Sequence, residues 1–441
     1  MKCLVTVILF FLWMVSFCSC RLLSEATGRR FNVLDYGADG NGKIDATPVH
    51  DPALSFYFDN LFAEKTRHLS IENVLEIKAF QRAWGDFCQA SEEMPTLVVP
   101  AGNTFLLKSV TFSGPCMSKN PHVLIQGTIV APDSFDSWDG DDDYENWIGF
   151  TAVFGLMVDG GGKFDGQGEA WWKACNNINH DNSLQDNDSA CSNRRQALHF
   201  NKCNGLRLSN LHHVNSQRGH ISINACDDVQ VSNLQILAPD ESPNTDGIDI
   251  SGSNHVNIQD SFIGTGDDCI AINGFSTYIN VTGVKCGPGH GISIGSLGKD
   301  GAYETVEEVH VKSCSLKGTQ NGVRIKTWEG GSGYVRKITF EDITFVNSEN
   351  PIIIDQQYNP NGIRGGPGIK ISDVTYRNVH GSSADEVAIT LDCAGKAACT
   401  NIVMDNVNII SSNPGKQIRA SCNNAKGTAI SASPIVPCLS S

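Results

Sequence analysis

Short runs in which apolar and polar residues alternate recur along most of the chain. Each run is a triplet with apolar first and third members, the period-2 pattern of a strand with one buried face. The triplets lie at 206–208, 229–231, 256–258, 279–281, 309–311, 338–340 and 369–371, with a last one near Ile402. Their starts are 23 to 33 residues apart, and a spacing in this range indicates a solenoid or repeat array.

A second set of triplets with the same pattern lies between members of the first set. These triplets are 221–223, 248–250, 270–272, 292–294 and 323–325. No helix-period segment separates the strands, and Gly and Asn mark the turns. We therefore predict an all-β fold, a right-handed single-stranded parallel β-helix. The alternative is a β-sandwich, which would need antiparallel hairpins with two-residue turns, and no such regularity is seen.

The open end of a solenoid needs a cover. Phe80, Ala83, Trp84 and Phe87 share one helical face within 79–88, so we predict an N-terminal capping helix there. Residues 46–78 have mixed charge and no strand triplet, and we interpret them as an atypical insertion before this helix. Residues 21–441 as a whole, with this insertion and helix included, are predicted to form a single β-helix domain.

Composition narrows the class of protein. The chain has 441 residues, of which 40% are hydrophobic and 18% charged, which excludes a disordered chain, a polytopic membrane protein and a coiled coil. Its net charge of -15 argues against a general nucleic-acid or anionic-membrane binder. We expect a monomer that binds neither nucleic acid nor, after loss of its leader, a membrane.

The first twenty residues predict secretion. Lys2, the apolar run 4–18 and the small residues before Arg21 have the order of a signal peptide over 1–20. The triplets 187–189 and 280–282 are N-glycosylation sequons. We expect an extracellular or cell-wall protein, and the alternative is an uncleaved anchor.

Sixteen cysteines also suggest an oxidising compartment. Close spacing favours four disulfides, and a fifth is a guess: Cys269–Cys286, Cys393–Cys399, Cys422–Cys438, Cys175–Cys191 and, as the guess, Cys88–Cys116. The three cysteines within or beside apolar strands are interpreted as buried free thiols: Cys203, Cys226 and Cys314.

Polar residues form a column immediately before the second set of strands. Asp246, Asp268 and His290 follow one another at intervals of 22 residues, which is one coil each time. Equivalent positions on stacked parallel strands lie about 4.8 Å apart. These side chains should therefore gather at one sheet edge, with Asp267 beside them.

Crowding carboxylates raises at least one carboxyl pKa. An enzyme uses such an arrangement, because one carboxylic acid must stay protonated while another stays ionised as base. Asp and Asn at the corners of a β-helix can instead cap turns. We favour that explanation for any single Asp, and catalysis for the cluster.

Two cations follow one coil later. Arg324 and Lys326 alternate with the apolar Val323 and Ile325, so both should point outward. They could pair with the carboxylates or grip an anionic substrate. Tyr358 could stack on a sugar or cover the solenoid wall.

Other chemistries fit the sequence less well. It has neither a phosphate-binding loop G-x-x-x-x-G-K-[ST] nor an H-E-x-x-H pair. Its cysteines lack zinc spacing, and calcium would need six to eight oxygen ligands. We expect no metal and no cofactor.

The chain closely resembles the polygalacturonases, family 28 of the glycoside hydrolases, and their plant members in particular. Four motifs carry the resemblance, in order: 244–247 (Asn-Thr-Asp-Gly), 266–269 (Gly-Asp-Asp-Cys), 289–291 (Gly-His-Gly) and 324–326 (Arg-Ile-Lys). The resemblance covers nearly all of 31–438. It implies a right-handed parallel β-helix that cleaves α-1,4 linkages between galacturonic acids of pectin with inversion.

The resemblance also implies roles for the matched residues. Asp267 would be the general acid, and Asp246 and Asp268 would activate the attacking water. His290 would tune Asp267. The galacturonate would be bound by Arg324, Lys326, Asn244 and Tyr358.

Two departures from the family pattern stand out. About thirty extra residues lie between Asp45 and Phe80 by comparison with the family, and Asn359 replaces a cysteine that plant members often have. Neither touches the catalytic motifs. The alternative functions are a β-helix hydrolase acting on rhamnogalacturonan or xylogalacturonan, a calcium-dependent pectate lyase, and a wall-binding β-helix without activity.

Overall fold

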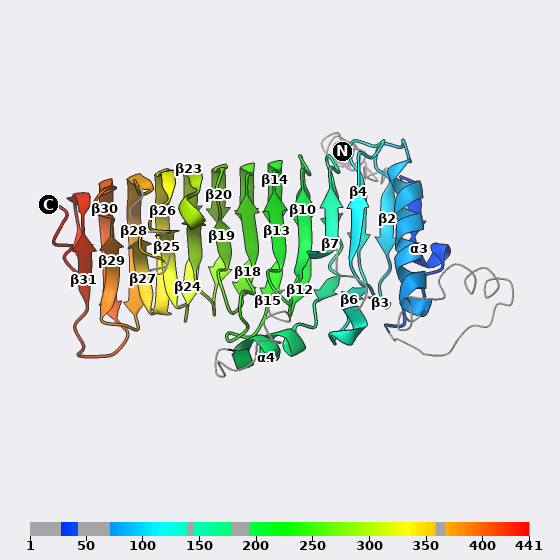
Figure 1. Ribbon diagram of the computed structural model, residues 1–441, viewed down its shortest axis with the longest axis horizontal. Helices are drawn as coiled ribbons and strands as arrows, with labels where there is room; N and C mark the ends of the chain where they lie inside the picture. The colour runs from blue at the N-terminus through cyan, green and yellow to red at the C-terminus, as the bar shows by residue number, and fades with distance from the viewer. Residues whose placement is uncertain (1–27, 43–70, 139–144, 179–193, 359–366, 441) are drawn as a thin grey trace, which may run out of the picture.

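The chain folds into a right-handed parallel β-helix, in which successive coils stack along one long axis (Figure 1). The computed structural model describes residues 28–42, 71–138, 145–178, 194–358 and 367–440. The predicted signal peptide, most of the segment 46–78, the sequon at 187–189 and Asn359 lie outside the described residues. Within them, no helix is long and apolar enough to cross a bilayer.

One long wall of the solenoid is an 11-stranded parallel sheet. It contains the second set of predicted triplets, paired in register as Ile221, Ile248, Ile270, Ile292 and Val323. Its strands are β4 (Val110–Ser113), β7 (Asn146–Thr151), β10 (Gln196–Asn201), β13 (Ile221–Asn224), β16 (Ile248–Ser251), β19 (Ile270–Ile272), β22 (Ile292–Leu297), β25 (Asn321–Thr327), β27 (Asn350–Asp355), β29 (Val387–Asp392) and β31 (Arg419–Asn423).

The other walls belong to a 22-stranded sheet that bends around the coils in two series. The first series is β1 (Arg30–Asn32), β2 (Thr96–Val99), β5 (His122–Ile125), β8 (Met157–Asp159), β11 (Arg207–Ser209), β14 (Asp227–Ser232), β17 (Asn254–Gln259), β20 (Ser276–Thr282), β23 (Tyr303–Lys312), β26 (Ser332–Ser348), β28 (Lys370–Ser383), β30 (Cys399–Ser411) and β32 (Ala425–Ala429).

The second series is shorter and merges into the long strands β26, β28 and β30. It consists of β3 (Thr104–Leu106), β6 (Thr128–Val130), β9 (Lys163–Asp165), β12 (His212–Val214), β15 (Gln235–Leu237), β18 (Phe262–Gly264), β21 (Lys285–Cys286), β24 (Ser315–Lys317) and β33 (Ala432–Ser433). Short 3-10 turns lie at η1 (Val33–Tyr36), η2 (Asp136–Trp138) and η4 (Lys299–Gly301).

One predicted strand was placed wrongly. The triplet 369–371 was expected to continue the ladder of 338–340, but Ile338 pairs with Val374 and Phe340 with Tyr376. The following rung, at Ile402, is correct. Both 369–371 and 374–376 have apolar first and third members, so the local pattern could not distinguish them. The interval of 14 residues between β27 and β28, against four between β25 and β26, changes the spacing between the rungs.

The N-terminal cap is confirmed, with a longer helix than predicted. Helix α3 (Ile71–Cys88) covers the first coils and starts within the segment interpreted as an insertion (Figure 1). The four residues of the predicted face are at most 6% exposed: Phe80, Ala83, Trp84 and Phe87. Trp84 packs on Phe112 with ring centroids 4.9 Å apart. A second helix, α4 (Glu169–Ile178), lies beside the wall near β12 and β15 (Figure 1).

Cross-links and thiols agree with the spacing argument. Four predicted disulfides are present: Cys88–Cys116, Cys269–Cys286, Cys393–Cys399 and Cys422–Cys438. The guessed pair Cys88–Cys116 is among them, whereas Cys175–Cys191 involves Cys191, which is outside the described residues. The three cysteines predicted to be free are free and buried: Cys203, Cys226 and Cys314. Cys269 directly follows Asp268, so the Cys269–Cys286 disulfide helps to fix the coil that carries this aspartate.

Candidate active site

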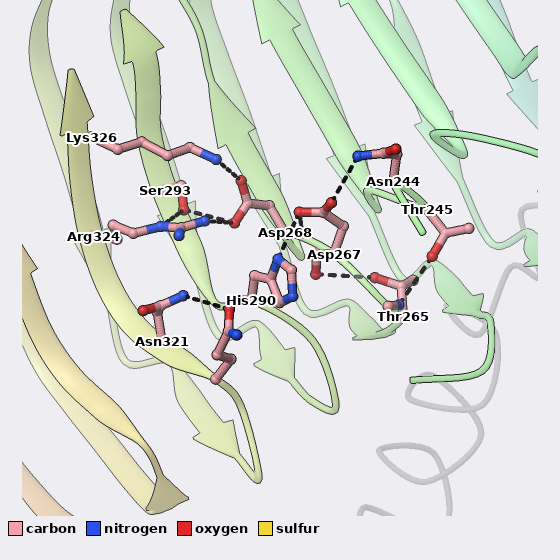
Figure 2. A network of polar contacts seen from close by, with 12 residues as sticks. Asn244, Thr245, Thr265, Asp267, Asp268, His290, Ser293, Asn321, Arg324 and Lys326 are labelled. Carbon is pink, nitrogen blue, oxygen red and sulfur yellow. Dashed lines mark hydrogen bonds and ion pairs between the residues drawn. The ribbon is translucent and has the colours of Figure 1, made fainter. Parts of the chain in front are cut away.

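The predicted polar column exists at the start of the strands of the 11-stranded sheet. Because Ile248, Ile270 and Ile292 are register partners, the residues two positions before them, Asp246, Asp268 and His290, occupy equivalent places on three stacked coils. Their backbones are joined directly, since the N–H of Gly247 donates to the carbonyl oxygen of Asp268. Figure 2 shows Asn244, Asp267, Asp268 and His290 from these coils converging on one patch.

Glycines beside the column allow the coils to approach this closely. A Cβ on Gly266, before Asp267, would lie 2.1 Å from the carbonyl oxygen of Ser242. A Cβ on Gly291, after His290, would lie 2.2 Å from the carbonyl oxygen of Gly322, and Gly291 also has φ +87°. Neither position has room for a side chain, which explains why the acidic and histidine motifs contain glycine there.

Asp267 is held by donors from three coils. Its Oδ1 lies 2.9 Å from His290 Nδ1 and accepts the backbone N–H of Asp268 at 2.8 Å. Its Oδ2 accepts a longer hydrogen bond, 3.3 Å, from Asn244 Nδ2. The side chain remains 16% exposed. Asp267 is therefore fixed in orientation while Oδ2 is the less occupied oxygen.

Asp268 lies below this surface in a buried ion cluster. Arg324 Nη2 donates to Oδ1 and Lys326 Nζ to Oδ2, both at 2.7 Å. Ser293 Oγ donates to Oδ1 at 2.8 Å and accepts from Arg324 Nε at 3.0 Å. Asp268 is 0% exposed, and the side chains of Arg324 and Lys326 are 9% and 8% exposed. Of the two possibilities that the sequence left open for these cations, the carboxylate pairing is present in the structure.

Asp246 has a different environment. No donor group among the described residues hydrogen-bonds to its carboxylate. Burial raises the pKa of Asp246 well above its ordinary value, and the charges of three neighbouring carboxylates raise it further. The loop behind it is anchored by His220, whose Nδ1 lies 3.1 Å from the backbone oxygen of Asp246. In the free protein, a shared proton is therefore favoured on Asp246.

Asp267 shows the opposite direction. Burial acts to raise its pKa, but the hydrogen bond and charge of His290, together with the Lys326 charge and the Asp268 N–H, outweigh burial and lower the pKa of Asp267. The resemblance predicted Asp267 as the protonated acid and Asp246 as a base. In the unliganded site the electrostatics run the other way, so the proposed roles require a proton to move when substrate binds.

Tyr358 closes the cationic side of the patch. Its ring lies 5.1 Å from Lys326 Nζ and 5.9 Å from the Arg324 guanidinium carbon. Trp328 packs edge-on against it with centroids 6.2 Å apart. Tyr358 follows β27 and is 38% exposed. An aromatic face beside two cations can stack on a sugar ring that carries a carboxylate.

Sequence reasoning missed two residues of the patch. Asp249 is the middle residue of a predicted strand triplet and points outward from β16, where Gln196 Nε2 donates to it at 2.9 Å. Burial raises the pKa of Asp249 to about 6. Arg194 donates to Asn244 Oδ1 at 2.8 Å. The outward alternation could have identified Asp249, whereas Arg194 lies before the strand and gave no signal.

Three side chains of the patch are close enough to share a metal ion. Ligand atoms of Asp267, Asp268 and His290 lie within 4.8 Å of one another. Both oxygens of Asp268 are already paired with cations, however, and a second cation there would be repelled by Arg324 and Lys326. The arrangement is better suited to proton transfer and anion binding than to metal binding.

Comparisons with known proteins agree with this chemistry. The sequence profile of the glycosyl hydrolases family 28 matches residues 88–433. A probable polygalacturonase of Arabidopsis thaliana is 45% identical over 369 residues, which cover 82% of this chain and 76% of that protein. A polygalacturonase of Persea americana is 42% identical over 353 residues, 79% of this chain and 73% of that protein.

Solved structures share the architecture. An endo-xylogalacturonan hydrolase from Aspergillus tubingensis superposes with a TM-score of 0.68 at 26% identity, over 81% of this chain and 95% of that chain. A hyperthermoactive exopolygalacturonase from Thermotoga maritima superposes with a TM-score of 0.65 at 18% identity, over 90% and 91%. At 18% identity, the second comparison shows only that the fold is shared.

Proposed function

The chain belongs to family 28 of the glycosyl hydrolases, and from this premise we propose that it hydrolyses the α-1,4 linkages between galacturonic acids of pectin with inversion at the anomeric carbon. One observation carries the proposal: Asp246, Asp267 and Asp268, from two adjacent coils, meet beside two permanent cations and an aromatic ring. Carboxylic acids perform the acid–base steps, and cations match a substrate with a carboxylate on every sugar.

The proposed reaction uses the carboxyls as a pair. Asp246, helped by Asp268, takes a proton from a water molecule as the water oxygen bonds to the anomeric carbon. The bond from that carbon to the bridging oxygen breaks, and the departing oxygen takes the proton of Asp267. Asp267 is then ionised and Asp246 protonated, and exchange with solvent restores the starting state. His290, bonded to Oδ1, keeps Oδ2 directed at the sugar.

Substrate binding would supply the proton shift that these roles need. A galacturonate carboxylate adds a negative charge near Asp267 and engages Lys326, one of the groups that lower the pKa of Asp267. Both changes favour the protonated form of Asp267. Once Asp267 is neutral, its charge no longer raises the pKa of Asp246. Lys326 also lowers the pKa of Asp246, so the proposed roles require that the substrate carboxylate acts more strongly on Asp267 than on Asp246.

The cations would have two tasks. Arg324 and Lys326 hold the Asp268 carboxylate in place at the bottom of the patch and present their remaining N–H groups to the substrate carboxylate. Asn244 and Tyr358 would contact the adjacent sugar, Tyr358 through its exposed ring face.

We propose that the protein is secreted and acts in the cell wall. The support is the leader pattern of 1–20, the disulfides, and an exposed sequon at Asn280, whose side chain lies on the outer face of β20. Arrival of the mature chain in the medium of expressing cells, shortened at its N-terminus, would establish this. Retention of an intact N-terminus inside the cell would refute it.

The activity is tested with purified protein and polygalacturonate. We expect new reducing ends without a UV-absorbing unsaturated product, insensitivity to chelators, and initial release of the β-anomer in NMR spectra. A parallel assay with xylogalacturonan addresses the second candidate, which the 26% identical Aspergillus structure favours. Exclusive cleavage of the xylose-bearing backbone would move the assignment to that substrate. Cleavage of neither backbone would overturn the proposed activity and leave a binding protein.

A further inference from the structure

A third arginine lies at the patch, outside the four matched motifs. Arg194 precedes β10, two coils before the strand that follows Asp246, and it is 6% exposed. Nη2 donates to Asn244 Oδ1 at 2.8 Å, and Nη1 donates to the backbone oxygens of Gln217, at 3.4 Å, and Pro243. One guanidinium therefore ties three coils together at the loop that carries Asn244 and Asp246.

We propose that Arg194 is a positioning residue that sets the amide orientation of Asn244 and thereby keeps the acid proton of Asp267 available to the substrate. The inference rests on the proposed function, because it assigns Arg194 a task in that reaction. Arg194 does not touch the reacting atoms. It acts through Asn244, whose Nδ2 donates to Asp267 Oδ2.

The direction of these hydrogen bonds follows from what a guanidinium can do. Arginine only donates, so the atom of Asn244 that faces it must be the amide oxygen. The amide nitrogen must then face Asp267, where it donates to Oδ2 at 3.3 Å. Asn244 also has φ +56°, a conformation that asparagine tolerates better than most residues. The guanidinium thus fixes an amide that would otherwise be free to turn over.

The hydrogen bonds that Asp267 already makes explain why the orientation of the Asn244 amide matters. Oδ1 already accepts the backbone N–H of Asp268 and is bonded to His290, so a proton on this carboxyl must sit on Oδ2. With the amide nitrogen facing it, Oδ2 keeps its proton free for the bridging oxygen of the substrate. If the amide turned over, its oxygen would accept that proton, and the acid would be engaged away from the substrate.

Charge acts in the same direction. Burial lowers the pKa of Arg194 to about 10, so it is a cation at working pH. Among the residues that the structure describes, the charged and titratable groups around the Arg194–Asn244–Asp267 chain include Arg218, Asp246, Asp249, Asp268, His290 and Lys326. Removing the Arg194 charge leaves this set more negative, which favours protonated carboxyls. In a variant without Arg194, the alkaline limb of the pH profile should therefore lie at higher pH than in wild type. The reaction should also be slower.

The test measures kcat and KM across pH for Arg194→Met and Arg194→Lys. For Arg194→Met we expect kcat to fall about tenfold with KM within about twofold, and the alkaline limb of kcat/KM to rise by about half a pH unit to one unit. Arg194→Lys restores a charge and donors, so both quantities should lie between Arg194→Met and wild type. Arg207→Met is the matched control, because Arg207 is an exposed arginine paired with Asp228.

The outcomes separate the two proposals. An active wild type together with a folded Arg194→Met that keeps the wild-type limb and kcat overturns the positioning role alone. The positioning role is also overturned if Arg194→Met lowers kcat without moving the alkaline limb of kcat/KM and Arg194→Lys does not restore kcat. That is the result expected of a purely structural arginine. If Arg194→Met does not fold, Arg194→Lys is judged by the same limb. An inactive wild type overturns the proposed function and this role together.

Discussion

Acidic and basic residues meet across coils in two regions of this solenoid, with opposite consequences. On the outer face of the 22-stranded sheet, Glu307 of β23 is the register partner of Arg336 of β26, and the pair is joined at 2.6 Å with the side chains 20% and 43% exposed. At the active patch, Asp268 meets Arg324 and Lys326 at 2.7 Å with almost no exposure. The N–O distances in the two regions are similar, whereas the burial of the side chains differs.

Burial decides what such a pair does. Water screens the attraction within the outer pair and can solvate either partner alone. The outer pair therefore contributes little to stability. The charges of the inner cluster are shielded from water, so each is stabilised by its oppositely charged neighbours instead. The same stacking of coils thus builds both partly exposed ion pairs on the outer wall and a buried ion cluster at the patch, and the patch is where chemistry can be performed.

The largest effect is expected from Asp268→Ala. It leaves two nearly buried cations without their carboxylate, so the free energy of unfolding should fall by about 3 to 5 kcal/mol and activity should be lost. Urea unfolding measures the change. Asp228→Ala, which removes an exposed partner of Arg207, is the control and should change little. Equal losses in the two variants would contradict the contrast between the regions.

Arg324→Ala should have a smaller but still large effect. Lys326 remains on Asp268, so the fold survives, but the substrate carboxylate loses the remaining N–H groups of Arg324 and Asp268 loses one of its two cations. We expect KM for galacturonan to rise about tenfold and kcat to fall as well. An unchanged KM would show that Arg324 serves only the internal ion cluster.

Substrate charge should shift the pH dependence. Activity needs one proton on the Asp246–Asp267 pair, so it is lost as pH rises through the pKa at which the pair loses that proton. The kcat/KM profile reports this pKa in the free enzyme, and the kcat profile reports it in the complex, where a substrate carboxylate adds negative charge and raises it. We predict that the alkaline limb of kcat lies about one pH unit above that of kcat/KM. Coincident limbs would argue against binding of a substrate carboxylate beside the pair.

The smallest effect is expected on the outer face. Glu307→Gln removes the charge that Arg336 contacts in solvent, and neither kcat nor the unfolding midpoint should change measurably. A marked loss of stability would mean that the exterior pairs are coupled to the core, and that burial alone does not separate the two regions.

Periodicity predicted what repeats and failed where the repeat changes. The 22-residue steps from Asp246 to Asp268 to His290 match the register because these coils lack long insertions. At Val374 a longer interval between β27 and β28 changes the spacing, and an apolar triplet at 369–371 matched the pattern equally well. The helix start at Ile71 was missed because residues 71–78 lie in a segment of mixed charge.

Contacts between distant coils could not be predicted in this way. Arg194 and Asn244 are 50 residues apart and meet only because the coils stack. The direction of the pKa shifts likewise depends on which carboxylates and cations share a buried volume, as Asp246 and Asp267 do with Lys326. The motifs identified the reacting groups, and the fold is needed to say which of them holds a proton.

The most direct measurement compares Asp267→Asn with Asp246→Asn on two leaving groups. Each variant is assayed on oligogalacturonate and on its p-nitrophenyl glycoside, whose departing phenolate needs no proton. If Asp267 donates the proton, Asp267→Asn should keep a much larger fraction of wild-type rate on the nitrophenyl substrate, while Asp246→Asn should lose both reactions equally. Recovery by Asp246→Asn alone would reverse the two roles and contradict the account.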